Sequence, residues 1–307
     1  MDYTLIRKQI IISIFSVDEL FEKMVLKGGN ALAVHGINSR TSKDIDLSIE
    51  KDWKENEKYY SEIIKKSLFK HFDEIDLYMF DYNFLKKPKN ISKEKEGFWG
   101  GYKVVFKLID KKLKEKLEKK AKNPEKLIDS LRKQAQKIGK TDNSKKFHID
   151  ISKYEVCYHK VELSKKDFDF IPVHIYSKSA LVIEKLRAIC QQSVEYQKQL
   201  KVSRRPRARD FYDIHEVIET SYKNKIDDPI FFFSDDDLNL VEQIFKIKKV
   251  PLKLLKEIEI DKDFHESDSE NLFEVIAIGS NPKEFEYYFN YVVDLAKKLL
   301  ERIKKRT

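Results

Sequence analysis

The sequence has few cysteines, glycines and prolines and no long apolar run, and these shortages narrow the possibilities. Its 307 residues include 2 cysteines, 8 glycines and 7 prolines. Cys157 and Cys190 lie far apart without CxxC spacing, so the sequence predicts neither a disulfide framework nor a zinc site. No segment reaches the roughly 18–20 apolar residues of a membrane span, and we recognise no signal peptide. We therefore expect a soluble, cytoplasmic protein with no membrane partner.

The composition is that of a folded protein with an excess of positive charge. Hydrophobic residues make up 41% of the chain and aromatic residues 12%, enough for one large domain or two ordinary ones. The net charge is +9, and basic residues cluster at 111–122, at 198–209 and in the tail at 297–306. Basic patches attract polyanions. A nucleic-acid partner is one reading of these clusters, and a solvated lysine-rich surface is the other.

Hydrophobic periodicity divides the chain into a mixed first part and a helical second part. Up to residue 177, helical patterns alternate with strand patterns; the helical ones are 5–24, 54–69 and 111–137, and the strands are 44–49, 75–80, 98–108 (or a hairpin turning at Gly100–Gly101), 147–151 and 173–176. Beyond it, 179–200, 208–222 and a segment opening at Ser234 are helical, and the phenylalanines at 231–233 read as core. We predict an α+β fold, with residues 1–177 forming a catalytic domain whose mixed sheet is flanked by helices. Residues 178–307 would form a helical bundle that completes the active-site cleft.

The most informative segment combines a glycine turn, a short helical stretch and two aspartates. Gly28 and Gly29, followed by Asn30, allow the backbone to come close to a ligand, and the free N–H groups of a following helix attract phosphate. Asp44 and Asp46 alternate with apolar residues, so both carboxylates face one side of a strand. Like charges repel unless a cation lies between them, and Mg²⁺ binds one or two carboxylates together with substrate phosphates. The segment therefore predicts a site for a nucleoside triphosphate and Mg²⁺.

Three further residues could complete this site. Asp150 lies in an alternating strand pattern, and a third carboxylate on a neighbouring strand would close the cation site. Lys185 lies on one predicted helix, and Asp210 and Asp213 lie on a similar face of the next. Each also has an ordinary structural explanation: Asp150 as a salt-bridged strand residue, Lys185 as a surface lysine, and Asp210 as a helix cap. Asp213 we interpret as structural.

In this order, four motifs resemble the AbiEii-type nucleotidyltransferase toxins, which belong to the superfamily of DNA polymerase beta and the aminoglycoside nucleotidyltransferases. The motifs are KGGNAL, RTSKDIDL, IEKLRA and RDFYDI, within residues 27–214. The resemblance implies a nucleotidyltransferase-like sheet. It also implies a Mg²⁺-dependent enzyme that uses a nucleoside triphosphate, with a separate antitoxin protein as partner.

The resemblance also implies roles for individual residues. The metal carboxylates would be Asp44 and Asp46, with Asp150 as the third. Residues near the triphosphate would be Gly28, Gly29, Asn30, Arg40, Ser42 and Lys185. Asp210 would complete the active site. Asn30 departs from the family, which has a hydroxyl residue there, although its amide can still donate a hydrogen bond. Arg40 could instead hold the aspartate strand by an ion pair.

These observations favour transfer of a nucleoside monophosphate to an acceptor hydroxyl. We expect the acceptor to be RNA, specifically a tRNA 3′ end, because the basic segments suit phosphates and the family resemblance points the same way. Two alternatives stay open: transfer to a small molecule or a protein, and a degenerate protein that binds nucleotide or RNA without turnover. Asn30 is the residue that favours the second alternative.

Overall fold

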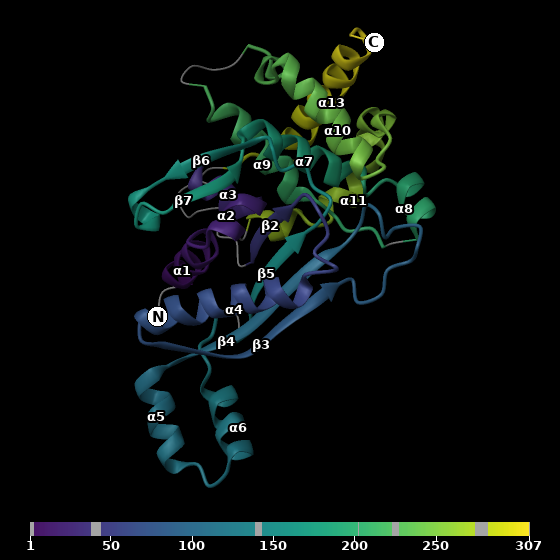
Figure 1. Cartoon of the computed structure of the whole chain (residues 1–307). Helices are drawn as coiled ribbons and strands as arrows, with labels where there is room; N and C mark the ends of the chain where they lie inside the picture. Colours follow the sequence, from purple (N-terminus) through teal and green to yellow (C-terminus); the bar gives the residue numbers. More distant parts are fainter. Residues whose placement is uncertain are drawn as a thin grey trace.

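A seven-stranded mixed sheet forms the centre of the chain in the computed structural model (Figure 1). The structure describes residues 3–37, 44–138, 143–201, 203–222, 227–273 and 282–306, without the side chains at 167, 271 and 273. The strands are β1 (Met24–Lys27), β2 (Ile45–Ile49), β3 (Leu77–Lys87), β4 (Gly101–Asp110), β5 (Phe147–Ser152), β6 (Lys160–Ser164) and β7 (Pro172–Tyr176). Their order is β3-β4-β5-β2-β1-β7-β6, with β2–β5 and β1–β7 parallel and the other pairs antiparallel.

One face of the sheet is apolar and covered by two helices. In β5, Phe147, Ile149 and Ile151 are buried, as alternation along a strand predicts. The Phe147 ring stacks on Tyr3 of α1 (Tyr3–Phe15) at a centroid distance of 6.2 Å. Through Phe106 of β4 the same cluster reaches Phe72 of α4 (Glu57–Glu74). The polar residues of β2 and β5 therefore point to the opposite face.

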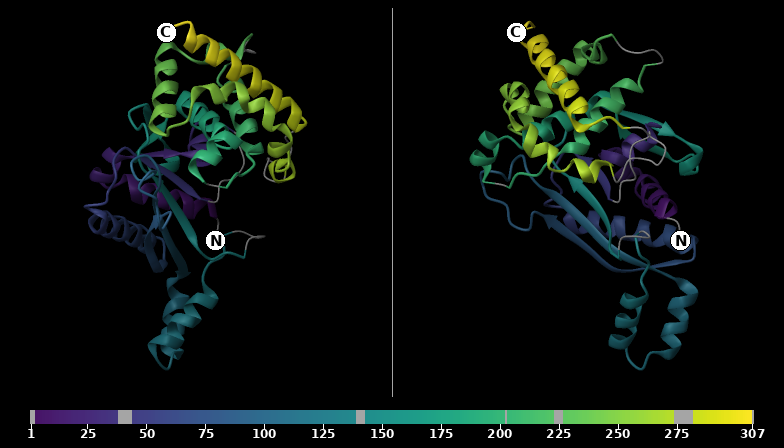
Figure 2. Two further views of the ribbon diagram at one scale, coloured as in Figure 1. Left: turned by 90° about the vertical axis from the view of Figure 1, so that its right-hand side faces the viewer. Right: turned by 180° about the vertical axis from the view of Figure 1, so that it is seen from behind.

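Smaller helices complete the first part of the chain: α2 (Asp18–Lys23), α3 (Gly28–Val34), η1 (Lys166–Phe168), α5 (Lys111–Lys120) and α6 (Pro124–Gln134). The last two form a hairpin that projects from the sheet, away from the C-terminal helices (Figures 1 and 2). Asp110 and Asn123 cap the two helices by accepting backbone N–H bonds, and a small core that includes Phe80 and Leu131 holds them to β3 and β4. The predicted interruption at Asn123–Pro124 is confirmed.

The second part of the chain is helical, as predicted. Its elements are α7 (Lys178–Cys190), α8 (Val194–Leu200), α9 (Ala208–Glu219), η2 (Pro229–Phe232), α10 (Asp235–Ile247), η3 (Leu252–Asp261), α11 (Lys262–Glu266), α12 (Ser269–Phe273) and α13 (Phe285–Lys304). Helix α7 begins directly after β7, at the predicted boundary, but one continuous apolar core joins both parts. The α+β architecture is therefore confirmed, and the division into domains 1–177 and 178–307 stays a prediction. None of the described helices is long and apolar enough to cross a bilayer.

Several predicted boundaries are wrong, each for a local reason. The single helix expected over 5–24 is two helices, because Val17 has extended backbone angles. The helix expected over 179–200 is also divided, and Ser193 caps its second piece. Strand β6 was not predicted, since it is largely exposed and alternates weakly. Strand β4 begins at Gly101, so the alternative hairpin at that point is wrong. Phe231 is 70% exposed and not core, whereas Phe233 is buried.

Candidate active site

Two aspartates face each other across neighbouring strands at the centre of the sheet. The parallel register of β2 and β5 pairs Asp46 with Asp150, which confirms the expectation that Asp150 lies on an adjacent strand. The antiparallel register of β1 and β2 places Lys27 opposite Asp46 on the other side. Asp44 immediately precedes β2 and is exposed. The alternation of β2 therefore brings acidic groups together on the face away from α1 and α4.

The pKa of Asp46 reports how close these charges lie. This pKa is raised from 3.8 to about 6, chiefly by burial; Lys27 opposes the rise, and the carboxylates of Asp150 and Asp44 add to it. An ionised Asp46 is therefore unfavourable unless positive charge is supplied. Lys27 supplies only part of it, because Lys27 also pairs with Glu155 at 3.2 Å.

The carboxylates of Asp46 and Asp150 fit a Mg²⁺ ion whose remaining ligands come from the substrate. Within the described ranges, no group of three or more His, Cys, Asp or Glu side chains is arranged to hold a metal ion. Asp150 Oδ2 lies 2.8 Å from Lys87 Nζ, while its buried Oδ1 lies 3.9 Å from Lys103 Nζ and has no hydrogen-bond partner among the described residues. Two carboxylates on paired strands are what Mg²⁺ uses when substrate phosphates complete its shell. The three-carboxylate site expected from Asp44, Asp46 and Asp150 stays a prediction.

Position 28 requires glycine, because the backbone there lies against the Asp46 side chain. Its φ is +66°, in the left-handed region, and an added Cβ would lie 2.5 Å from Asp46 Oδ2. Only glycine tolerates both the backbone conformation and the contact. The glycine turn at the start of α3 is therefore built against the aspartate strand, as the sequence indicates.

Asn30 secures the other end of the aspartate strand. Its side chain is 1% exposed, and its Nδ2 donates a hydrogen bond of 2.7 Å to the backbone oxygen of Asp44. The amide donor is therefore used within the protein, and its expected contact with the triphosphate stays a prediction. Gly29 is buried beside it in α3. Arg40 and Ser42 lie outside the described residues.

Lys185 and Asp210 are brought together by the packing of α7 on α9. Lys185 Nζ lies 2.8 Å from Asp210 Oδ1 and 2.7 Å from Asp213 Oδ2. All three side chains are buried, with Asp213 0% exposed. The interpretation of Asp213 as structural stays a prediction, and its buried ion pair with Lys185 is consistent with it. Lys185 is also close enough to Asp46 to lower its pKa.

A buried ionic network, which we did not predict, lies beside the aspartates. Glu155 pairs with Lys27 at 3.2 Å and with Lys248 at 3.0 Å. Burial alone would raise the pKa of Glu155, but Lys27, Lys248 and Arg187 lower it to about 2. Because these residues lie far apart in sequence, no local pattern indicates their association.

A cavity of about 400 Å³ opens next to Asp150. Its lining has an excess of basic over acidic residues: the basic ones are Lys27, Lys87, Arg187, Arg205 and Lys248, and the acidic ones are Asp150 and Glu155. The surface near Asp150 is therefore suited to an anionic molecule approaching the aspartates. Arg204, in the same basic segment as Arg205, is committed internally to Asp261 and stacks over Phe264.

This arrangement of carboxylates beside a glycine turn matches a known class of enzyme. Residues 10–290 match the profile of the family described as "Nucleotidyl transferase AbiEii toxin, Type IV TA system". The chain is a nucleotidyltransferase. It belongs to the AbiEii family of toxins of type IV toxin–antitoxin systems. The family expected from the four motifs is thus confirmed.

Solved structures with a similar arrangement include three bacterial proteins. A Helicobacter pylori protein described as a nucleotidyltransferase is 15% identical, with TM-score 0.48 and coverage of 99% of this chain and 96% of that one. JHP933 from Helicobacter pylori is 16% identical, with TM-score 0.49 and coverages of 98% and 92%. MenT4, a nucleotidyltransferase toxin from Mycobacterium tuberculosis, is 13% identical, with TM-score 0.45 and coverages of 98% and 86%. No curated protein matches the sequence.

Proposed function

We propose that the protein transfers a nucleoside monophosphate from a nucleoside triphosphate to an RNA hydroxyl and releases pyrophosphate. The observation that carries this proposal is the pairing of Asp46 with Asp150 in register, with Gly28 in contact with Asp46. Such transfer depends on positioning and on neutralising charge rather than on a covalent intermediate. The conclusion that the toxin acts with an antitoxin follows from the family; the identity of that partner is not implied.

Each residue group has a defined part in the proposed reaction. Asp44, Asp46 and Asp150 would hold Mg²⁺, which when bound neutralises phosphate charge and lowers the pKa of the attacking hydroxyl. Gly28 carries no side chain, which leaves room for the Asp46 carboxylate against the glycine turn. Lys185, held by Asp210, is close enough to lower the pKa of Asp46 and would supply positive charge to the phosphates there during transfer.

The choice of RNA as acceptor is supported by basic side chains on the Asp150 side of the site. Arg205 and Lys87 line the cavity that opens there. The projecting α5–α6 hairpin carries the basic cluster at 111–122, and no residue of α5 is buried. The third cluster contributes less than we expected. Lys297, Lys298 and Arg302 of the tail form ion pairs with Glu259, Asp228 and Asp235.

Labelled nucleotides test the proposal directly. The protein is incubated with each of the four α-labelled ribonucleoside triphosphates, Mg²⁺ and total tRNA. Label should appear on RNA, and Asp46→Asn should reduce it by about 100-fold or more, as expected when a charge-stabilising group at the reacting centre is lost. Asp294→Asn, an exposed change on α13, is the matched control and should keep full activity.

Other outcomes would change the proposed acceptor or the proposed activity. Label on a small molecule or on protein would replace RNA as the acceptor, and nucleotide binding without any transfer would indicate a degenerate binding protein. RNA affinity should also fall steeply between low and moderate salt, because phosphate contacts release counterions. A flat salt dependence would contradict the basic surface as the RNA site.

A further inference from the structure

One side of helix α5, in the projecting hairpin, carries a stripe of lysines. The lysine stripe consists of Lys112, Lys116, Lys119 and Lys120, all of them exposed. At 3.6 residues per turn, these four positions lie within an arc of about 100°. None of the four side chains has a hydrogen bond or an ion pair with a described residue. With Glu115 alone at its edge, the stripe keeps an excess of positive charge, which favours a polyanion.

The hairpin is held firmly to the sheet, so the lysine stripe has a fixed position. Arg132 of α6 binds both carboxylate oxygens of Asp81, with Nε 2.8 Å from Oδ2 and Nη2 3.0 Å from Oδ1. Lys107 of β4 lies 2.9 Å from the same Asp81 Oδ2. Two-point pairing of this kind fixes orientation as well as distance. Together with the small core under the hairpin, it sets the position of α5 relative to the sheet.

Strand β4 connects the hairpin to the aspartates. Lys103 is paired in register with Asp150, and β4 ends at Asp110, seven residues farther along. At about 3.3 Å per residue, the base of the hairpin lies about 23 Å from Asp150, and α5 itself is about 15 Å long. By alternation, Lys103 and Lys107 lie on the same face of the sheet as Asp150. The aspartates and the hairpin therefore lie toward opposite ends of one strand, with basic side chains between them.

The composition of the hairpin favours the backbone of double-stranded RNA over a single strand. Residues 111–134 include no aromatic residue, whereas sites for single-stranded nucleic acid stack bases on aromatic rings. Double-stranded RNA is recognised mostly through its shape, its phosphates and its 2′-hydroxyls. Lysines four positions apart lie about 6 Å apart along a helix. The stripe thus presents a row of positive charges to a backbone that carries a phosphate at every nucleotide.

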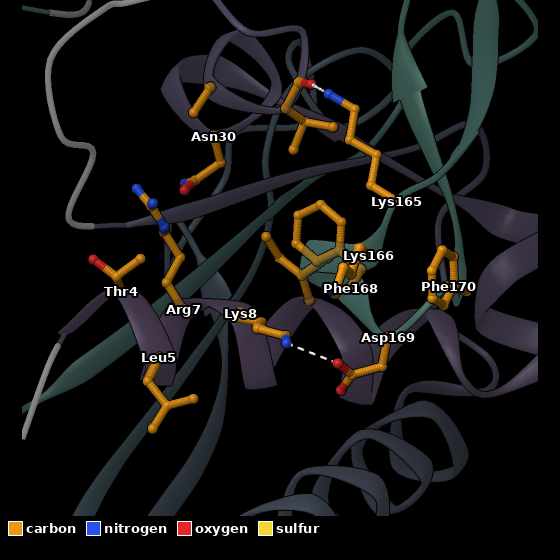
Figure 3. Close-up of a pocket in the computed structure, with 13 residues that line it drawn as sticks. Thr4, Leu5, Arg7, Lys8, Asn30, Lys165, Lys166, Phe168, Asp169 and Phe170 are labelled. Atoms are coloured by element: carbon orange, nitrogen blue, oxygen red, sulfur yellow. Dashed lines mark hydrogen bonds and ion pairs between the residues drawn. The ribbon is translucent and has the colours of Figure 1, made fainter.

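Basic side chains in the cleft between α1, α3 and η1 are less available. This cleft has a volume of about 940 Å³, and Figure 3 shows the residues that line it. Lys8 Nζ lies 2.8 Å from Asp169 Oδ1, and Lys165 donates a hydrogen bond to the backbone oxygen of Val34. These two charges are used within the protein, whereas the lysine stripe is exposed along its whole length.

We propose that the lysine stripe of α5 binds the phosphate backbone of the double-stranded part of the acceptor RNA while the 3′ end of that RNA reaches the aspartates. The inference rests on the proposed function and adds a requirement to it. The acceptor must be a structured RNA whose double helix extends about 23 Å or more from the reacting end. A short or single-stranded acceptor does not reach the stripe.

RNA stem-loops that share one 3′ sequence and differ in stem length test this inference. Fluorescence anisotropy measures their binding to the full chain without nucleotide, so no transfer takes place. The triple variant Lys112→Gln, Lys116→Gln, Lys120→Gln should bind the longest stem about tenfold or more weakly, and its slope of log affinity against log salt should be smaller by about 2–3. Affinity for single-stranded RNA of the same 3′ sequence should stay within about twofold. Arginine at the same three positions keeps the charge and should preserve binding.

The matched control removes three lysines from the opposite face of the molecule. Lys58, Lys66 and Lys70 are exposed on α4, which covers the sheet face away from the aspartates. Their replacement by glutamine changes the net charge equally, and at physiological salt it should change long-stem affinity by less than about twofold. Thermal unfolding checks that each variant is folded.

Several results would overturn the inference. They are unchanged long-stem binding in the α5 variant, equal losses in the α5 and α4 variants, and an equal loss for single-stranded RNA. Stripe-dependent binding of poly-glutamate without binding of the stems would also overturn it, by assigning the stripe to an acidic protein. Stripe-dependent binding of long stems without nucleotide transfer would support the inference and count only against the proposed reaction.

Discussion

Asp46 and Asp150 occupy directly paired positions on parallel neighbouring strands, 104 residues apart in the chain. Neighbouring strands lie about 4.8 Å apart, so the two carboxylates share one small area of the sheet face. Asp46 is thereby given an unfavourable charge that a divalent cation would relieve. The repulsion between these two carboxylates is reduced when a cation binds between them.

Asp46→Asn should stabilise the protein while it removes activity. The pKa of Asp46 is about 6 in the folded protein, against 3.8 ordinarily, so its ionisation at pH 7 opposes folding. Removing that charge should raise the free energy of unfolding by about 1–3 kcal/mol in chelator, at 1.4 kcal/mol per pKa unit. Urea unfolding in EDTA and in Mg²⁺ measures this. Mg²⁺ should stabilise the unaltered protein more than the variant, and a loss of stability in Asp46→Asn would contradict the expected repulsion.

Gly28→Ala and Gly36→Ala separate backbone strain from the contact with Asp46. Both glycines have left-handed backbones, with φ of +66° and +75°, but a Cβ at Gly36 meets nothing within 4 Å. Gly36→Ala should cost about 1 kcal/mol of stability and leave activity intact. Gly28→Ala should cost more and abolish nucleotide transfer, because the new Cβ displaces the Asp46 carboxylate. Equal effects of both changes on activity would show that this contact is unimportant.

Lys185→Met should destabilise the protein strongly. It leaves the buried carboxylates of Asp210 and Asp213 without their ammonium partner, and breaking a buried ion pair from one side costs about 3–5 kcal/mol. Lys298→Met, which breaks two ion pairs at a site 38% exposed, should cost less than about 1 kcal/mol. Chemical denaturation compares the two variants. Adding Asp213→Asn to Lys185→Met should recover part of the loss, and no recovery would contradict the pairing.

Stability should fall as pH drops from 7 to 5, because His265 is buried as the neutral imidazole. Burial and the charges of Arg204 and Arg207 lower its pKa from 6.5 to about 4. The unfolded chain therefore takes up a proton at a higher pH than the folded one, which costs roughly 2 kcal/mol by pH 5. Asp46 contributes with the opposite sign. The comparison of His265→Gln with the unaltered protein isolates the histidine, and parallel pH profiles for the two proteins would refute the assignment.

Local pattern was enough for most elements and for the family. The alternation around Asp46 predicts a strand with a buried side, and the pairing of Asn123 with Pro124 predicts where a helix begins. Both depend on interactions between neighbours in sequence, which the sequence displays directly. Strand β6 and the breaks near Val17 and Ser193 were missed, because edge exposure and helix ends depend on what packs nearby.

The sequence by itself determined the chemistry of this protein: carboxylates, a glycine turn and a lysine in an order that identifies a nucleotidyltransferase. Only the tertiary structure decided which of these groups meet. Strand register placed Asp150 opposite Asp46, and helix packing placed Asp213 on Lys185. Such contacts join residues far apart along the chain, and they arise from burying apolar faces together rather than from any local pattern.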